Sequence, residues 1–174
     1  MKPNLSRALS FALRHHPEKF GLVLDAHLYA DVATLLGVMG ISQSELDELV
    51  VTNDKKRFEY NADRTRLRAC QGHSIPGDLQ LARRDPKLML YHGTAQAHLA
   101  SILKQGLLKG KRHHVHLSED AGTATAVGRR SGAEILLGID ARAMVGEKYA
   151  FYQSSNGVWL TEQVPPKFIH LVTA

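Results

Sequence analysis

The sequence predicts an α+β protein built in two parts, a helical N-terminal part and a strand-rich C-terminal part. Apolar residues recur at helical spacing through the first 50 residues, and two short strand-like runs rich in basic residues follow. Glycine, proline, aspartate and arginine then dominate residues 72–86, a composition typical of a linker. Strand-like runs prevail after it. A chain of 174 residues is long enough for two small domains, which we place at residues 1–80 and 81–174.

The first predicted element is a helix over residues 4–16. Leu5, Leu9 and Leu13 recur every four residues and therefore share one apolar stripe of this helix. Pro17 makes a continuation beyond residue 16 unfavourable. We therefore expect a helix that packs one face on a core and ends in cationic residues.

A strand, two helices and a hairpin complete the N-terminal part. A short strand is expected at residues 21–24, and Asp31 can cap a helix over residues 32–39. The capping-box pattern at residues 42–45 opens a third helix, and residues 55–68 have the pattern of a basic hairpin. This order of elements is typical of a winged-helix module. Such modules bind nucleic acid or other proteins, and the basic hairpin favours nucleic acid.

The C-terminal part is predicted to consist mainly of strands. Residues 87–91 form an apolar strand that leads into a His-Gly-Thr sequence. Helices are expected at residues 96–104, ended by Gly106, and at residues 119–130. Further strands are expected at residues 115–118, 134–140, 148–152, 158–161 and 168–172.

Charge and cysteine content restrict the kind of partner and compartment. A formal net charge of +5 suggests a polyanionic partner, with nucleic acid the first candidate. The one cysteine, Cys70, excludes an intramolecular disulfide and fits a reducing cytoplasm. No apolar run is long enough to cross a bilayer, and the N-terminus has no apolar segment of a secretory signal. We expect a cytoplasmic protein without a membrane partner, and a monomer, because no exposed apolar surface is predicted.

The sequence lacks the motifs of several common nucleotide-binding, hydrolase and metal sites. The sequence contains no Gly-x-Gly-x-x-Gly after the first strand, no Walker-type loop and no Gly-x-Ser-x-Gly elbow. His113, His114 and His116 suggest a metal site, but no cysteine or paired acidic motif completes a ligand set. We therefore expect no metal cofactor.

Cationic and hydrogen-bonding residues are the candidates for function. Converging arginines bind a phosphoryl group well because the planar guanidinium matches its oxygens, and histidine exchanges protons near neutral pH. Each candidate taken singly also has a structural explanation, such as a cation that complements the C-terminal dipole of a helix. The candidates are Arg14, His15, Arg68, Arg130, His92, Thr94, His116 and Ser118.

Taken together, six motifs resemble those of the NAD-dependent RNA (tRNA) 2'-phosphotransferases of the KptA type. They occur in the order of that family and span nearly the whole chain. The motifs are Leu13-Arg14-His15-His16-Pro17, Leu67-Arg68-Ala69-Cys70-Gln71-Gly72-His73-Ser74, Leu90-Tyr91-His92-Gly93-Thr94, His114-Val115-His116-Leu117-Ser118, Val127-Gly128-Arg129-Arg130-Ser131-Gly132 and Ser155-Asn156-Gly157-Val158-Trp159-Leu160. The main departure is Cys70, where the family more often has a polar residue such as asparagine.

The resemblance implies two domains with distinct roles. Residues 1–80 would form a winged-helix RNA-binding lobe, and residues 81–174 an NAD-binding lobe like that of ADP-ribosyltransferases. The essential Arg-His-Arg-Arg set of the family corresponds to Arg14, His15, Arg68 and Arg130, with Arg129 as an alternative for the last position. The implied NAD-binding residues are His92, Gly93, Thr94, His116, Leu117, Ser118, Asn156 and Val158.

The resemblance also implies a reaction in two steps. The RNA 2'-phosphate attacks NAD and displaces nicotinamide, giving an ADP-ribosylated RNA, and transesterification then releases 2'-hydroxyl RNA and ADP-ribose 1'',2''-cyclic phosphate. Relatives that modify proteins commonly have glutamate where this chain has Val158. A phosphate acceptor is already anionic and needs no such base. Two alternatives stay open, namely NAD-dependent modification of terminal nucleic-acid phosphates and a non-catalytic winged-helix binder.

Overall fold

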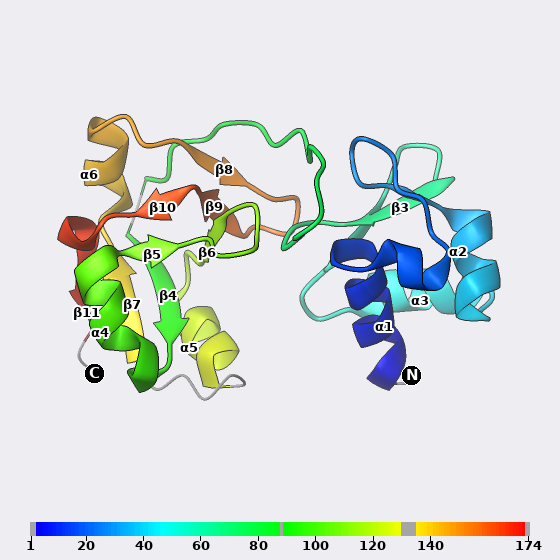
Figure 1. Cartoon of the computed structure of the whole chain (residues 1–174), viewed down its shortest axis with the longest axis horizontal. Helices are drawn as coiled ribbons and strands as arrows, with labels where there is room; N and C mark the ends of the chain where they lie inside the picture. The colour runs from blue at the N-terminus through cyan, green and yellow to red at the C-terminus, as the bar shows by residue number, and fades with distance from the viewer. Residues whose placement is uncertain (1–2, 88, 130–134, 173–174) are drawn as a thin grey trace. The chain divides into compact units, whose positions relative to one another are not determined.

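The computed structural model describes residues 3–87, 89–129 and 135–172 (Figure 1). The chain folds into two compact units, Met1–Leu81 and Ala82–Ala174. Both combine helices with small antiparallel sheets, so the predicted α+β class is confirmed. None of the helices in these residues is both long and apolar enough to cross a membrane.

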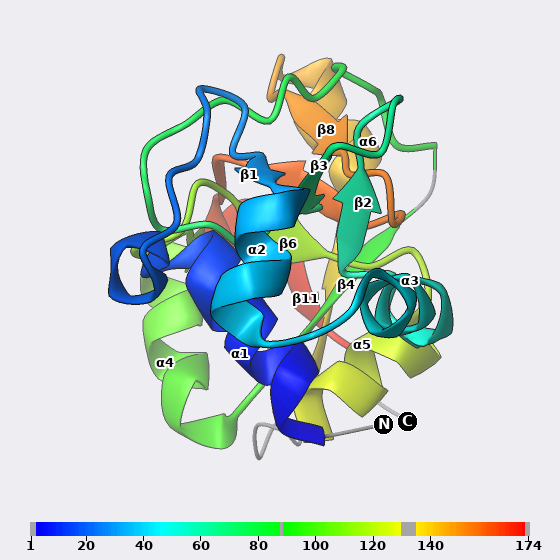
Figure 2. The ribbon, with the colours of Figure 1, turned by 90° about the vertical axis from the view of Figure 1, so that its right-hand side faces the viewer.

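The first unit packs three helices against a three-stranded antiparallel sheet (Figure 2). Its strands are in the order β1-β3-β2. The elements are α1 (Pro3–Arg14), the 3-10 helix η1 (Pro17–Phe20), β1 (Ala30–Asp31), α2 (Val32–Met39), α3 (Gln43–Thr52), β2 (Phe58–Tyr60) and β3 (Arg66–Ala69). Leu9 and Leu13 of α1 are fully buried in the core of this unit, as the apolar stripe predicted.

Local signals fix the starts of α2 and α3. The carboxylate of Asp31 accepts a hydrogen bond from the backbone N–H of Thr34 at 2.7 Å. Ser42 and Glu45 form the predicted capping box, since each side chain accepts from the backbone N–H of the other residue. Both caps satisfy backbone donors that the first helical turn leaves open.

The predicted strand at residues 21–24 is wrong. Only Leu24 makes an isolated bridge, to Ala30, and the strand lies instead at Ala30–Asp31, paired with β3. The carboxylate of Asp25 accepts hydrogen bonds from the backbone N–H groups of His27 and Tyr29, at 2.9 and 3.0 Å. These bonds fold residues 25–29 into a tight turn, so pairing with β3 begins only after it.

The predicted linker packs partly on the first unit. Leu79 is buried, and the backbone N–H of Asp78 donates to the carbonyl of Ala26 at 2.9 Å. This attachment explains why the first compact unit extends to Leu81, well into the segment of linker-like composition.

The second unit contains two three-stranded antiparallel sheets and a two-stranded one. Their strand orders are β11-β7-β4, β6-β9-β8 and β10-β5. Helix α5 contacts β4 and β7. The elements are β4 (Leu90–Thr94), α4 (Gln96–Gln105), β5 (Leu107–Leu108), β6 (Val115–Leu117), α5 (Ala121–Arg129), β7 (Ile135–Ile139), α6 (Ala141–Gly146), β8 (Phe151–Gln153), β9 (Trp159–Thr161), β10 (Gln163–Val164), η2 (Pro166–Phe168) and β11 (Ile169–Leu171).

The strand that carries the His-Gly-Thr sequence begins later and extends further than predicted. Instead of ending at Tyr91, β4 runs from Leu90 to Thr94, and it pairs with β7 over its whole length. Cross-strand pairing continues the strand through Gly93, a residue that local sequence alone marks as a break. His92 is therefore held in the middle of strand β4 rather than in a loop after it.

Gly106 is required where α4 turns into β5. Its φ is +83°, and a Cβ atom there would lie 2.1 Å from the backbone oxygen of Val164 on β10. We expect Gly106→Ala to lower the free energy of unfolding by roughly 3 kcal/mol or more, because the clash is with backbone. Urea denaturation would measure this. Gly110→Ala is the control, since its φ of +60° is also positive but no neighbouring atom lies within 4 Å of the added Cβ.

Candidate active site

The predicted site residues, catalytic and NAD-binding, divide between the two units. Arg14, His15 and Arg68 belong to the first unit, and the predicted NAD-binding residues belong to the second. Arg130 lies outside the described residues, and the alternative Arg129 is the last residue of α5. The two sets are described separately below.

The segment after β3 folds back on the end of α1. The backbone N–H of Ser74 donates to the carbonyl of Arg14 at 3.0 Å, and the Ser74 hydroxyl and His15 Nδ1 are hydrogen-bonded at 2.9 Å. The Arg14 side chain lies against Gly72, whose φ of +89° favours glycine. Two motifs that are distant in the sequence thus meet and fix the direction of both Arg14 and His15.

Arg68 is held by a different set of contacts. Its Nε donates to the Glu59 carboxylate at 2.7 Å, and Nη1 donates to the carbonyls of His27 and Leu79, each at 3.2 Å. The guanidinium lies over the Tyr29 ring, 4.4 Å from its centroid. Among the described residues, none accepts a hydrogen bond from Nη2. The guanidinium is therefore fixed in orientation and keeps donors for an incoming oxyanion.

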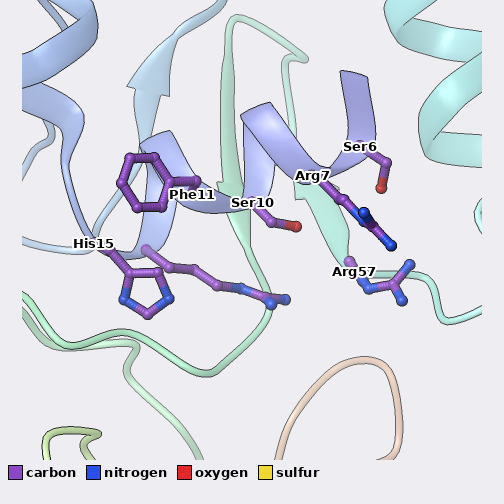
Figure 3. Close-up of a pocket in the computed structure, with 7 residues that line it drawn as sticks. Ser6, Arg7, Ser10, Phe11, His15 and Arg57 are labelled. Atoms are coloured by element: carbon purple, nitrogen blue, oxygen red, sulfur yellow. The ribbon is translucent and has the colours of Figure 1, made fainter. Parts of the chain in front are cut away.

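A basic groove of about 450 Å³ runs along α1 (Figure 3). Its lining residues are Ser6, Arg7, Ser10, Phe11, Arg14, His15 and Arg57. The lining includes three arginines and no carboxylate, so the groove suits an anion. The structure thus brings Arg14 and His15 together in this groove, whereas Arg68 is not among its lining residues.

In the second unit, His92 of β4 lies beside His116 of β6. The two strands are joined through Tyr91 and Ser118, whose backbone N–H and carbonyl groups bond each other at 2.8 and 2.9 Å. His92 Nδ1 lies 3.0 Å from the carbonyl oxygen of His116, which can only accept. Nδ1 therefore carries the hydrogen. Burial is the main cause that lowers the pKa of His92, so its ring is neutral at pH 7 and Nε2 is an acceptor.

The depressed pKa of His92 predicts a dependence of stability on pH. The unfolded chain binds a proton near the ordinary value of 6.5, whereas the folded chain resists it. The free energy of unfolding should therefore fall as the pH is lowered from about 6.5 towards the folded pKa. Melting temperatures measured between pH 7.5 and 5 would show this slope, and His92→Asn should reduce it. A slope unchanged by His92→Asn would assign it to other groups, such as His114, whose pKa burial also lowers.

Asn156 and Val158 lie in the turn that leads into β9. The Ser154 hydroxyl donates to the side-chain oxygen of Asn156 at 2.7 Å, and the backbones of Ser154 and Val158 are hydrogen-bonded at 2.9 Å. Leu117 pairs with Trp159 at the end of the ladder between β6 and β9, and continuing the same antiparallel register places Val158 opposite Ser118. The predicted NAD-binding residues therefore lie on β4 and β6, directly after β6, and in the turn before β9. The apolar side chain of Val158 supplies no carboxylate at this position.

Two arginines of the groove, Arg7 and Arg57, were not predicted from the sequence. Arg7 precedes Arg14 by two helical turns, so helical spacing could have placed it on the same face. Arg57 offers no such signal, because its place in the groove depends on tertiary contacts of the segment before β2. Within the described ranges, no group of three or more histidine, cysteine or acidic side chains is arranged to hold a metal ion.

A second cavity, of about 500 Å³, lies beside the NAD-binding candidates in the second unit without including any of them. Trp159, next to Val158, lines it and donates from Nε1 to Glu119 at 2.6 Å. This contact ties the start of β9 to the segment that follows β6. It therefore supports the positions of Ser118 and Val158.

Comparison with known proteins agrees with these motifs. Residues 2–163 match the family model described as RNA 2'-phosphotransferase, Tpt1 / KptA family. A protein of Flavobacterium johnsoniae named a probable RNA 2'-phosphotransferase is 47% identical over 171 residues, which are 95% of this chain and 94% of the relative. A protein of the same name from Pseudomonas fluorescens is 48% identical over 172 residues, covering 94% and 93% of the two chains. This chain therefore belongs to the RNA 2'-phosphotransferase, Tpt1 / KptA family, and is a transferase.

Proposed function

We propose that this protein removes a 2'-phosphate from RNA by transferring it to NAD. The observation that carries the proposal is the family match over residues 2–163, which includes both sets of candidate residues. The basic groove with Arg14 and His15 supports a phosphorylated substrate, since its lining includes no carboxylate. The net charge of +5 supports RNA as the polyanion.

The arginines are proposed to bind the 2'-phosphate. Arg14 and Arg68 are each held by contacts that fix their orientation, and Arg130 is assigned by its motif. Fixed donors stabilise developing negative charge without reorganising during the reaction. His15, oriented by Ser74, is proposed to donate a hydrogen bond or a proton to the same phosphate.

The polar, uncharged character of the strand cluster fits NAD. Neutral His92, with Nε2 as an acceptor, suits a ribose hydroxyl, which can donate to it. Thr94 and Ser118 are further hydroxyl groups on the same strands or directly after them. NAD supplies an anomeric carbon activated by its nicotinamide leaving group. Val158 offers no base, which is consistent with an acceptor that is already anionic.

The proposed chemistry balances as two substitutions. An oxygen of the RNA 2'-phosphate bonds to the anomeric carbon while the bond to nicotinamide breaks, and nicotinamide leaves with the bonding electron pair. The ribose 2''-oxygen then bonds to phosphorus, its proton is lost, and the RNA 2'-oxygen leaves and is protonated. The products are nicotinamide, 2'-hydroxyl RNA and ADP-ribose 1'',2''-cyclic phosphate.

The proposal is tested by incubating the protein with RNA that bears one internal 2'-phosphate, with and without NAD, and identifying the products by mass spectrometry. Loss of the phosphate only with NAD, together with ADP-ribose cyclic phosphate, is the expected result. ADP-ribose attached to a terminal phosphate of a control oligonucleotide, with the 2'-phosphate untouched, would favour the first alternative. Binding of RNA without nicotinamide release would favour the non-catalytic binder.

The domain roles form part of the same proposal. The element order of the first unit supports a winged-helix RNA-binding lobe, and the antiparallel strand cluster of the second supports an ADP-ribosyltransferase-like NAD-binding lobe. The buried thiol of Cys70 supports a reducing, cytoplasmic setting. We propose that the protein acts as a monomer, and light scattering of the active preparation would test this.

A further inference from the structure

We propose that the part of the groove formed by Arg7, Ser10 and Arg57 binds a backbone phosphate of the RNA that lies roughly three nucleotides from the one that carries the 2'-phosphate. This inference rests on the proposed function, because it assumes that the 2'-phosphate lies at Arg14 and His15. It adds residues outside the predicted catalytic set. Their role would be to hold the RNA chain rather than to act on the reacting phosphate.

The helix places these residues along one face. Arg7, Ser10 and Arg14 follow at spacings of three and four residues, so they form one polar row on α1 opposite the buried apolar stripe. Arg7 and Arg14 are separated by about 10 Å along a helix with ~1.5 Å rise per residue. That span corresponds to roughly three stacked nucleotides at ~3.4 Å each. An RNA strand that passes along α1 would therefore bring flanking phosphates to Arg7.

Arg57 reaches the groove because Asn53 holds it there. Asn53 is buried, with 6% of its surface exposed. Its side-chain oxygen accepts from Arg57 Nη1 at 3.1 Å, while its side-chain nitrogen donates to the Ser6 hydroxyl at 3.1 Å. One buried amide thus connects α1 to the segment before β2. The backbone carbonyl of Arg57 also accepts from the N–H of Cys70 at 2.9 Å, which fixes it to the end of β3.

The charge at this end of the groove is largely uncompensated. Arg7 is exposed and makes no hydrogen bond or ion pair with any other residue that the structure describes. Arg57 meets one carboxylate, that of the exposed Asp54 at 3.4 Å. In the close-up of the groove, Arg7 of α1 and Arg57 point into the same space (Figure 3). Two guanidinium groups beside the Ser6 and Ser10 hydroxyls are a donor set for phosphate oxygens.

The test compares Arg7→Ala with wild type on two RNA substrates that each carry one 2'-phosphate. The first is a dinucleotide, which lacks most flanking phosphates, and the second is a decanucleotide with the 2'-phosphate near its middle. Arg7→Ala should raise the KM for the decanucleotide about tenfold, the effect of one lost charge-assisted hydrogen bond. The KM for the dinucleotide, kcat and the KM for NAD should stay unchanged. Arg57→Ala should act in the same direction.

Salt dependence gives a second measurement that does not need catalysis. The affinity for an unmodified decanucleotide should depend on salt less steeply in Arg7→Ala, by ~0.7 in log–log slope for one lost phosphate contact. Arg142→Ala, which removes an equal charge from the exposed surface of α6, is the matched control and should leave the slope at its wild-type value.

The outcomes separate this inference from the proposed function. Wild-type activity combined with an unchanged decanucleotide KM and salt slope in Arg7→Ala would overturn the phosphate site. So would an equal rise in KM for the dinucleotide, because the groove would then act on the reacting phosphate itself. A wild-type protein that removes no 2'-phosphate, but whose salt slope falls in Arg7→Ala, would refute the proposed reaction and leave the RNA-binding site standing.

Discussion

Arg68→Ala is expected to slow removal of the 2'-phosphate at least ~100-fold while the affinity for NAD stays near its wild-type value. The Arg68 side chain is 13% exposed, and its guanidinium is fixed by Glu59, by two carbonyls and by the Tyr29 ring, so it is preorganised for an oxyanion. Removing it also leaves the carboxylate of Glu59 without its ion pair. A fall of ~1–3 kcal/mol in the free energy of unfolding should accompany the loss of activity.

Arg66→Ala is the matched control for this prediction. Arg66 lies two residues away on the same strand, carries the same charge and pairs with Asp25 at 2.6 Å, but is half exposed. Activity should survive Arg66→Ala, since no part of the proposed phosphate site is removed. Full activity of a folded Arg68→Ala protein would show that Arg68 serves the fold and not the phosphate. Arg68→Lys keeps the charge without the planar fork and should accumulate ADP-ribosylated RNA.

Replacing His92 should impair the use of NAD. Two different substitutions separate the roles of its two ring nitrogens. In His92→Asn, the side-chain nitrogen can still donate to the carbonyl of His116, as Nδ1 does at 3.0 Å, but the acceptor at Nε2 is lost. We expect NAD-dependent nicotinamide release to fall ~100-fold or more, with RNA affinity unchanged. Single-turnover assays with varied NAD would measure both binding and chemistry.

His92→Gln tests the opposite loss, because it keeps a polar group near the position of Nε2 and removes the one at Nδ1. Its side-chain amide can reach the position of Nε2, but the hydrogen bond to His116 that orients the ring is lost. A partial recovery of NAD use relative to His92→Asn is expected. Nicotinamide release by His92→Asn at the wild-type rate would exclude Nε2 from the NAD site, whatever the result for glutamine.

Elements with local signals were predicted correctly from the sequence. The range of α2 and the capping box of α3 follow from residues within one helical turn. Elements fixed by distant partners were not. The strand expected at residues 21–24 lies at β1, where β3 supplies the pairing, and β4 continues through Gly93 because β7 lies beside it. Short strands such as β5 and β10 depend on each other alone and leave no periodic pattern.

The site shows the same division. The motifs identified Arg14, His15 and His92, but they did not reveal that Ser74 orients His15 or that Glu59 and Tyr29 hold Arg68. Those contacts join residues that are up to 59 positions apart in the chain. Arg57 enters the groove only through the buried amide of Asn53, and neither residue belongs to a motif. Such positioning contacts require the folded structure.

The transfer of phosphate to NAD is tested most directly with an RNA whose 2'-phosphate carries oxygen-18 in its non-bridging positions. Of the bonds to the phosphorus atom, the proposed mechanism breaks only the one to the RNA 2'-oxygen. All of the label should therefore appear in ADP-ribose 1'',2''-cyclic phosphate, and the RNA should leave with an unlabelled 2'-hydroxyl. Label recovered in inorganic phosphate, at a rate that does not depend on NAD, would show a hydrolase and contradict the account.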